Sequence, residues 1–157
     1  MDLDKADMKK AIPAEVFDEK LKGLKWITVR NLDNPQKEIS QLKEAIDIIK
    51  KDSRKKTIVT DFQFISVILS FYDNSPNKHW YRKHSYPGKN DKYFNVYRQF
   101  FIDKLKENEV EIVYTIKPLY GEYDGLETIL NKNCIKKTKI TEILESQLLL
   151  NCQELKK

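Results

Sequence analysis

The sequence is poor in glycine: four glycines, five prolines and two cysteines are spread over 157 residues. The glycine-rich phosphate loops G-x-G-x-x-G and G-x-x-x-x-G-K-[ST] are both absent. The G-x-S-x-G turn that carries the nucleophilic serine of many hydrolases is absent as well. The chain therefore has no sequence signature of a dinucleotide-binding site, a P-loop NTPase or an α/β-hydrolase.

Long apolar stretches are also missing. The longest uncharged run near the middle of the chain, residues 62–72, has 11 residues, whereas a transmembrane helix needs about 20. The first ten residues alternate acidic and basic side chains and have no apolar core of a secretory signal. We expect the chain as given to be soluble, either alone or as a piece of a longer protein.

The two cysteines, Cys134 and Cys152, are 18 positions apart. In a reducing compartment they would be two buried thiols, and in an oxidising one they could form a disulfide. His79 and His84 have a spacing that zinc sites use, but the cysteines lack the close C-x2-4-C spacing of a zinc-ligand pair. We therefore expect no metal and no cofactor, and the state of the cysteines stays open.

The chain has a net charge of +5, from 29 basic and 24 acidic residues. All but four of the basic residues are lysines, which favours solvation and codon bias over a nucleic-acid surface. One cluster, Lys78, Arg82, Lys83 and Lys89, mixes basic with aromatic residues as single-strand binders do, and it stays the candidate for binding phosphate. The run KKDSRKK at 50–56 is interpreted as solvated cations at a helix C-terminus.

Local patterns predict several strands. Residues 25–29 and 57–60 are rich in β-branched side chains, and the segment VEIVYTI at 110–116 is the clearest strand. The tail, residues 140–152, is ambiguous, because its first part has helical spacing and its end, LLLNC, resembles a closing strand.

Helices are expected between these strands. Asn34-Pro35 predicts a helix start, followed by a stripe of apolar residues through Ile49. Shorter helices are predicted over 62–70 and around 126–130, and a longer one from Asn90 to a left-handed terminator at Asn108. The buried face of this longer helix is expected to include Phe94, Tyr97, Phe101 and Leu105, widened by Tyr93, Val96 and Phe100.

The alternation of strands and helices predicts an α/β fold, a three-layer sandwich around a small and mostly parallel sheet. Such a sheet would be Rossmann-like without the dinucleotide fingerprint. We expect one domain over residues 1–157, with a lead-in segment at 1–20 and an irregular insertion at 71–90, where periodicity is lost.

In open parallel sheets, ligands bind at the carboxyl ends of the strands. Polar and aromatic residues that follow the predicted strands, or lie in the insertion, are therefore the candidates for binding a ligand. They are Asp61, Gln63, His79, Trp80, Arg82, His84, Lys117, Tyr120 and Tyr123. No pair among them has the spacing of a known nucleophile and base, so no catalytic residue is predicted.

Several of these residues also have a purely structural interpretation. Asp61 directly follows a strand and could cap the next helix. Trp80 could anchor the insertion to the core instead of stacking on a sugar or a base. The two histidines lie among lysines and arginines, which favours simple exposure.

The order of four segments resembles a known family. They are LKGLKWITVRNLDNPQKEISQLKEA, KKTIVTDFQFI, SPNKHWY and NDKYFNVYRQFFIDKLKENEVE, followed by the Cys134–Cys152 tail. In this order they resemble the C-terminal non-membrane region of bacterial multi-span glycosyltransferase-like proteins. These are of the dolichyl-phosphate-mannose mannosyltransferase-like (GT-C) type, and the similarity covers residues 6–155.

The resemblance implies a role next to catalysis. Enzymes of that type transfer a sugar from a polyprenyl-phosphate donor, with their essential acidic residues in the membrane-embedded part. This chain would then be a non-catalytic accessory domain on the periplasmic face of the inner membrane. Its partners would be the membrane-embedded part of the same protein and a carbohydrate or polyprenyl-phosphate sugar. The compartment favours a Cys134–Cys152 disulfide.

In that hypothesis Trp80 stacks on a sugar, while Asp61 and Gln63 bind hydroxyl groups. Two other hypotheses stay open. One is a stand-alone cytoplasmic module that binds nucleic acid or phosphate, although nucleic acid is the less favoured partner. The other is an uncharacterised α/β enzyme that depends on Asp61.

Overall fold

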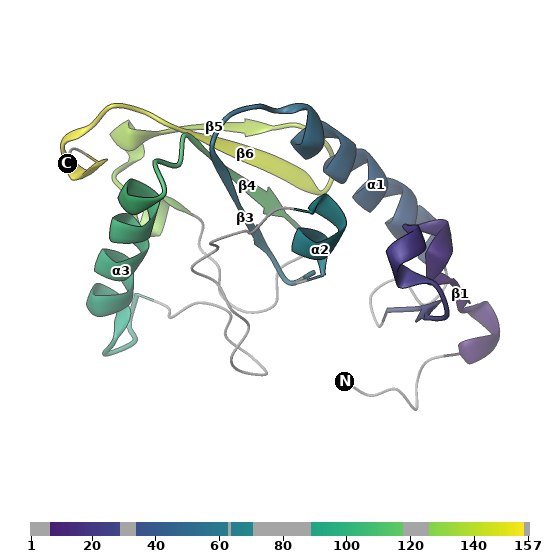
Figure 1. The fold of residues 1–157 in the computed structure, drawn as a ribbon. Helices are drawn as coiled ribbons and strands as arrows, with labels where there is room; N and C mark the ends of the chain where they lie inside the picture. The colour runs from purple at the N-terminus through teal and green to yellow at the C-terminus, as the bar shows by residue number, and fades with distance from the viewer. Residues whose placement is uncertain (1–6, 29–33, 63, 71–88, 118–125, 156–157) are drawn as a thin grey trace. The chain divides into compact units, whose positions relative to one another are not determined.

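The computed structural model describes residues 7–28, 34–62, 64–70, 89–117 and 126–155. The chain divides into two compact units, Met1–Lys51 and Asp52–Lys157. Figure 1 shows the elements of both units in chain order, and each unit is described below by itself.

The first unit contains a small two-stranded sheet. Strand β1 (Ile12–Pro13) pairs antiparallel with β2 (Lys25–Trp26), and two 3-10 turns, Ala14–Val16 and Glu19–Leu21, lie between them. The predicted strand at 25–29 is therefore present in its first two residues, but it pairs with β1. Gly23 has φ 86, a left-handed conformation that glycine adopts without strain, at the turn into β2.

Helix α1 (Pro35–Lys51) confirms the helix predicted from Asn34-Pro35. The side chain of Asn34 accepts a hydrogen bond of 3.0 Å from the N–H of Lys37, as an N-cap residue does. On the first turn of α1, the carboxylate of Glu38 is buried and accepts hydrogen bonds of 2.9 Å each from Trp26 Nε1 and Thr28 Oγ1. Glu38 therefore ties the helix to the segment that begins at β2.

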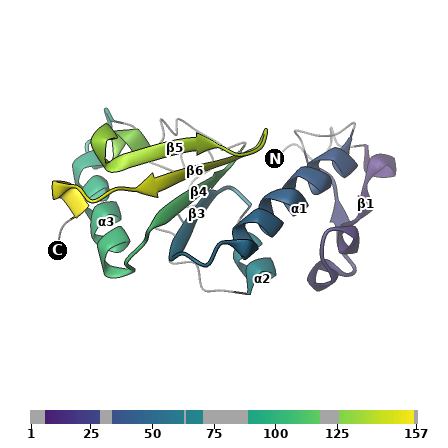
Figure 2. The ribbon, with the colours of Figure 1, turned by 90° about the horizontal axis from the view of Figure 1, so that it is seen from above.

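The second unit is built on a four-stranded sheet. Its strands, in spatial order, are β3 (Lys56–Thr60), β4 (Ile112–Ile116), β6 (Leu144–Leu149) and β5 (Ile135–Lys139), and this order is visible in Figure 2. Strands β3 and β4 are parallel, with Lys56 opposite Ile112 and Thr60 opposite Ile116. The other two pairings, β4 with β6 and β6 with β5, are antiparallel.

The prediction of a mostly parallel, Rossmann-like three-layer sandwich is therefore wrong. The described residues form a mixed α/β fold with two sheets, in which most strand pairings are antiparallel. The difference arises after residue 134, where the chain forms the hairpin β5–β6. Thr141 shapes its turn, because its hydroxyl accepts a hydrogen bond of 3.1 Å from the N–H of Leu144. Strand β6 then occupies the place beside β4 that a further parallel strand would have taken.

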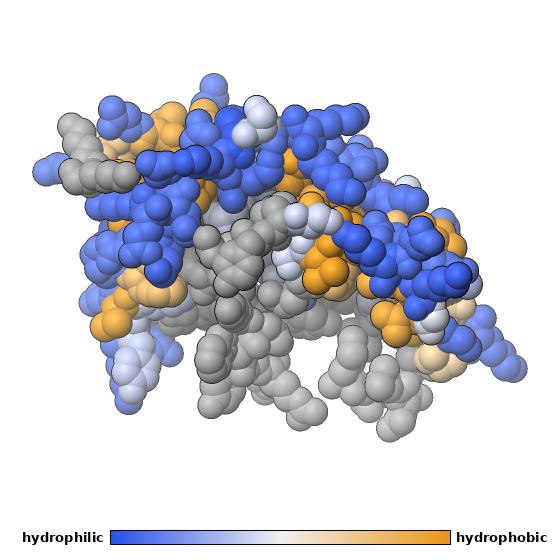
Figure 3. Space-filling model, viewed as in Figure 1, coloured by the Kyte–Doolittle hydropathy of each residue, from blue (hydrophilic) through white to orange (hydrophobic). Residues whose placement is uncertain are grey.

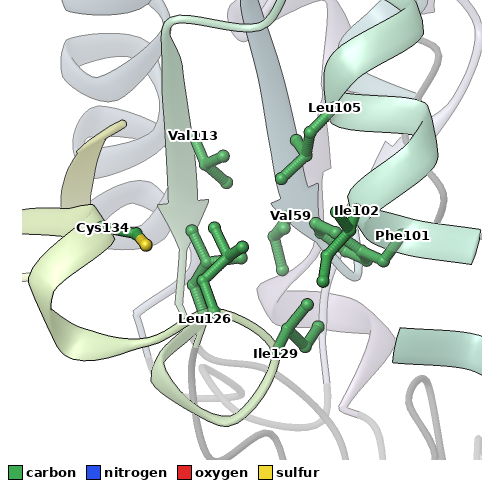
Figure 4. Close-up of a cluster of buried hydrophobic side chains, with 9 residues drawn as sticks. Val59, Phe101, Ile102, Leu105, Val113, Leu126, Ile129 and Cys134 are labelled. Carbon is green, nitrogen blue, oxygen red and sulfur yellow. The ribbon is translucent and has the colours of Figure 1, made fainter. Parts of the chain in front are cut away.

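A hydrophobic core lies between one face of this sheet and helix α3 (Phe94–Glu107). The sheet contributes Val59 and Val113, which are fully buried. Figure 4 shows side chains of α3 and of the segment after residue 125 converging on them. The buried members are Val59, Phe101, Ile102, Leu105, Val113, Leu126, Ile129, Leu130 and Cys134. A shorter helix, α2 (Ile65–Leu69), follows β3 and confirms the centre of the helix predicted at 62–70.

The predicted width of the buried face of α3 is wrong. Tyr93, Val96 and Phe100 are 61%, 72% and 45% exposed. At 100° per residue, Val96 and Phe100 lie about 100° or more around the helix from Phe101 and Leu105, and Tyr93 is the N-cap residue that precedes the helix. Among the described residues, the face of the molecule in Figure 3 is mostly hydrophilic, with apolar residues in separate patches.

The end of α3 also differs from the prediction. Asn108 has φ −88, and the left-handed residue is Glu109, with φ 50. The N–H of Val110 then donates a hydrogen bond of 2.9 Å to the carbonyl of Leu105, which closes the end of the helix and leads into β4.

The adjacent phenylalanines of α3 provide a direct test of this core. We expect Phe101→Ala to lower the free energy of unfolding by about 3–5 kcal/mol, because it leaves a cavity in the core. Phe100→Ala removes the same atoms from an exposed position and should change it by less than about 1 kcal/mol. Urea denaturation of both variants measures the difference, and equal losses would contradict the orientation of α3.

Candidate functional site

The carboxyl ends of the two parallel strands form the candidate site. Because Thr60 lies opposite Ile116, the next residues, Asp61 and Lys117, leave neighbouring strands at the same edge of the sheet. The structure therefore brings these two predicted residues to one edge. The other predicted site residues lie outside the described part of the chain: Gln63, His79, Trp80, Arg82, His84, Tyr120 and Tyr123.

Four charged residues form a network at this edge, here called the sheet-end network: Lys117, Glu145, Lys137 and Glu127. Lys117 Nζ lies 2.5 Å from Glu145 Oε1, and Lys137 Nζ lies 3.4 Å from Glu145 Oε2. Lys137 also forms an ion pair of 3.3 Å with Glu127. The network thus joins the end of β4 to β6, β5 and the short 3-10 turn Leu126–Thr128.

The register of the sheet explains why these side chains meet. Glu145 is paired with Thr115 on β4 and with Lys139 on β5, while Lys137 is paired with Gln147. Side chains at alternate positions of a strand point to the same face. Lys117 and Thr115 follow Val113 at alternate positions, so all three side chains lie on the same face of the sheet. The network therefore lies on the face that also carries the core under α3, but nearer to the end of β4.

Glu145 is the centre of the sheet-end network, with 12% of its side chain exposed. Burial acts to raise the pKa of its carboxyl, but the hydrogen bond from Lys117 and the charges of Lys137 and Lys117 outweigh burial and lower that pKa. Burial acts to lower the pKa of Lys137, and the charges of Glu127 and Glu145 raise it above its ordinary value. Both groups are therefore charged at neutral pH.

Two uncharged polar residues lie between the sheet-end network and the hydrophobic core. Thr115 and Gln147 are 0% and 1% exposed, and Thr115 Oγ1 donates a hydrogen bond of 3.3 Å to Gln147 Oε1. The sheet therefore changes from apolar to polar towards its end. This arrangement can offer a ligand positively charged hydrogen-bond donors, from the lysines, and negatively charged acceptors, from the glutamates.

Asp61 is not the N-cap residue of the helix that follows it. Helix α2 begins at Ile65, and its N-cap residue, Phe64, makes no side-chain capping hydrogen bond. After β3, the hydroxyl of Thr60 accepts a hydrogen bond of 3.1 Å from the N–H of Phe62. The half-buried Asp61 lies directly after this strand, one position beyond the last pair of the register, Thr60 and Ile116.

A second polar cluster, formed by Asp52, Arg54 and Tyr114, was not predicted. Arg54 donates to both carboxylate oxygens of Asp52, at 2.9 Å from Nε and 2.8 Å from Nη2. The hydroxyl of Tyr114 donates to Asp52 Oδ2 at 2.5 Å. Tyr114 is on β4 and follows the core residue Val113, so it points to the opposite face of the sheet. Asp52 and Arg54 belong to the basic run at 50–56, so the interpretation of that run as solvated cations is incomplete.

The pKa values in this cluster follow from its contacts. The hydrogen bonds from Arg54, with that from Tyr114, hold the pKa of Asp52 well below its usual range despite partial burial. Burial, together with the neighbouring Asp52, raises the pKa of Tyr114 to about 12. Asp52 is thus an anion that accepts hydrogen bonds from both Arg54 and the neutral phenol of Tyr114. These contacts join the start of the second unit to strand β4.

A disulfide joins Cys134 to Cys152, with an S–S distance of 2.09 Å and a Cα–Cα distance of 5.3 Å. It links the residue before β5 to the segment after β6, and Cys134 packs in the core (Figure 4). Glu154, which lies in the same segment after β6, makes two further contacts. It forms an ion pair of 2.7 Å with Arg98 on α3 and accepts a hydrogen bond of 2.8 Å from the N–H of Asn131.

Within the described ranges, no three His, Cys, Asp or Glu side chains are grouped as a metal site would require. None of the described helices has both the length and the apolar character needed to cross a membrane. Comparison of the chain with models of protein families, with curated proteins and with solved structures finds no match.

The Asp52 cluster predicts a pH dependence of stability. Because its pKa in the folded chain is lowered from 3.8, ionised Asp52 stabilises the fold above about pH 4, and this contribution is lost as the pH falls further. At neutral pH, Asp52→Asn should lower the free energy of unfolding by about 1–3 kcal/mol. The difference in the free energy of unfolding between the variant and the unmodified chain should then become smaller as the pH falls towards about 2.

Urea denaturation at a series of pH values measures this difference. Asp47→Asn is the matched control, because Asp47 is exposed on α1, and it should stay close to the unmodified chain at every pH. A difference for Asp52→Asn that does not change with pH would contradict the assignment.

Proposed function

We propose that the chain is a non-catalytic accessory domain of a membrane glycosyltransferase-like protein, on the periplasmic side of the membrane. In this proposal, it contacts a carbohydrate or a lipid-linked sugar at the edge formed by Asp61, Lys117 and the sheet-end network. The observation that carries the proposal is the mixed charge of this edge.

A sugar hydroxyl is both a hydrogen-bond donor and an acceptor, so a sugar site needs groups of both kinds. The sheet-end network supplies carboxylate acceptors and ammonium donors side by side, within about 4 Å of one another. Lys117 and Lys137 are 47% and 43% exposed, and Glu127 is 27% exposed, so a ligand can reach them. A polyanion lying directly on the network would meet repulsion from Glu127 and Glu145, which favours a hydroxyl-rich ligand at this position.

The disulfide supports the proposed compartment. Disulfides persist in oxidising environments such as the bacterial periplasm and are rare where cytosolic reductants act. The Cys134–Cys152 bond therefore agrees with the periplasmic location that the family resemblance implies. The membrane-embedded part of the same protein remains the predicted partner, and stacking by Trp80 and binding by Gln63 and Tyr120 remain predictions.

Chemical-shift mapping with neutral glycans tests the proposal on the disulfide-bonded chain. We expect a panel of mannose, glucose and N-acetylglucosamine oligosaccharides, at millimolar concentration, to shift the amide signals of Asp61, Lys117 and Glu145. Glu145→Gln should weaken the binding about tenfold, because it removes the charged acceptor at the centre of the network. Glu107→Gln is the matched control: Glu107 is also ion-paired, to Lys104, but lies 59% exposed on α3.

Shifts confined to other parts of the chain, or no shift with any glycan, would overturn the sugar site. Binding of an oligonucleotide near Lys89, weakening steeply with added salt, would instead support the phosphate-binding alternative.

A further inference from the structure

Strand β5 is an exposed edge of the four-stranded sheet. It pairs only with β6 in the described sheet and ends the strand order, as Figure 2 shows. Lys136, Lys137, Thr138 and Lys139 are all exposed, whereas β3, at the other edge, is mostly buried. A strand in this position presents main-chain groups to any chain that can lie beside it.

The hydrogen bonds at its two ends fix which groups these are. The N–H of Leu150 donates to the carbonyl of Cys134, and the N–H of Ile140 donates to the carbonyl of Leu144. In an antiparallel pair, hydrogen-bonded positions alternate with positions whose main-chain groups point away from the partner strand. The even-numbered residues of β5 therefore bond to β6, and the N–H and C=O groups of Lys137 and Lys139 point outward.

The outward groups of β5 are not used by the described part of the chain. Among the residues that the structure describes, the main-chain N–H groups of Lys137 and Lys139 have no hydrogen-bond partner. The N–H of Ile135 differs, because it bonds to the carbonyl of Lys132 in the preceding 3-10 turn. The open part of the edge therefore runs from Lys136 to Lys139.

The side chains of this edge are strongly basic. Lys137 is paired with the two carboxylates of the sheet-end network. Lys136 and Lys139 form no ion pair within the described part of the chain, and Lys132 lies just before the strand. Within the described ranges, two lysines without an ion-pair partner therefore lie beside the outward N–H groups of Lys137 and Lys139.

From this combination, we propose that β5 binds an extended acidic segment of a partner protein, which joins the sheet as a fifth strand. Main-chain hydrogen bonds to Lys137 and Lys139 would hold the segment. Asp or Glu side chains opposite Lys136 and Lys139 would select it, because opposite charges across neighbouring strands attract. A second copy of the chain is disfavoured as the added strand, because pairing of β5 with itself would bring lysines together.

Titration with labelled peptides tests the proposal. The probe is a fluorescent eight-residue peptide of Thr and Val that carries two Glu residues three positions apart, so that both can lie opposite Lys136 and Lys139. Its matched control has Lys in place of each Glu. We expect the Glu peptide to bind the disulfide-bonded chain at least about tenfold more tightly than the Lys peptide, with affinity falling as salt is added. Amide shifts of Lys137 and Lys139 should accompany binding.

Two variants separate main-chain pairing from simple charge attraction. Lys139→Ala removes the charge and keeps the outward N–H, whereas Lys139→Pro removes both, at an edge position where proline is tolerated. Lys139→Pro should bind at least about fivefold more weakly than Lys139→Ala. A second measurement uses the unmodified chain and two N-methylated peptides, one methylated at the odd-numbered and one at the even-numbered residues. Only one set of peptide N–H groups faces β5, so one methylated peptide should lose binding and the other should keep it.

Three results would overturn the proposal. One is equal binding of the N-methylated and unmethylated peptides, which indicates a cationic patch without strand addition. Another is a preference for the Lys peptide or for neither. The third is a concentration-dependent dimer in sedimentation velocity that Lys139→Pro abolishes and the Glu peptide does not dissociate, which would assign the edge to a second copy of the chain.

Discussion

The antiparallel pairing of β6 with β4 is the interaction on which the second unit depends. It places Gln147 beside Val113 and Glu145 beside Thr115, so that one strand contributes both to the boundary of the core and to the polar edge. Without this pairing, Lys117 would have no carboxylate partner on β6, and the hairpin β5–β6 would not be joined to the rest of the sheet. The core under α3, the sheet-end network and the basic edge are therefore consequences of one register.

Carboxylates that are partly or fully buried hold distant segments together in both units. Glu38 accepts from Trp26 and Thr28 in the first unit, and Asp52 accepts from Arg54 and Tyr114 in the second. Each carboxylate receives at least two donors, which offsets the cost of removing its charge from water. Glu145 differs because its donors are two exposed lysines, so its contacts can be exchanged for contacts to a ligand.

Periodicity predicted the elements that bury an apolar face. Helix α1 and strands β3 and β4 were recognised from their apolar spacing, and Asp61 and Lys117 from their places after two of these strands. Strand β5 was missed because an edge strand with three lysines has no apolar alternation to detect. Glu145 and Lys137 were missed because only the pairing of β4 with β6, and of β6 with β5, brings them towards Lys117. Glu127 joins them from a 3-10 turn, through its ion pair with Lys137. Sequence spacing also could not separate Phe100 from Phe101, because the rotation of α3 is set by packing.

The mixed sheet is tested most directly by nuclear Overhauser effects between backbone protons in the folded, disulfide-bonded chain. In antiparallel strands, the Hα atoms of a non-hydrogen-bonded pair lie close together, because their Cα atoms are only about 4.5 Å apart. The register predicts such Hα–Hα contacts between Tyr114 and Ser146 and between Ile112 and Leu148, and none between β3 and β4. Absence of the β4–β6 contacts, or a parallel pattern there, would contradict the account.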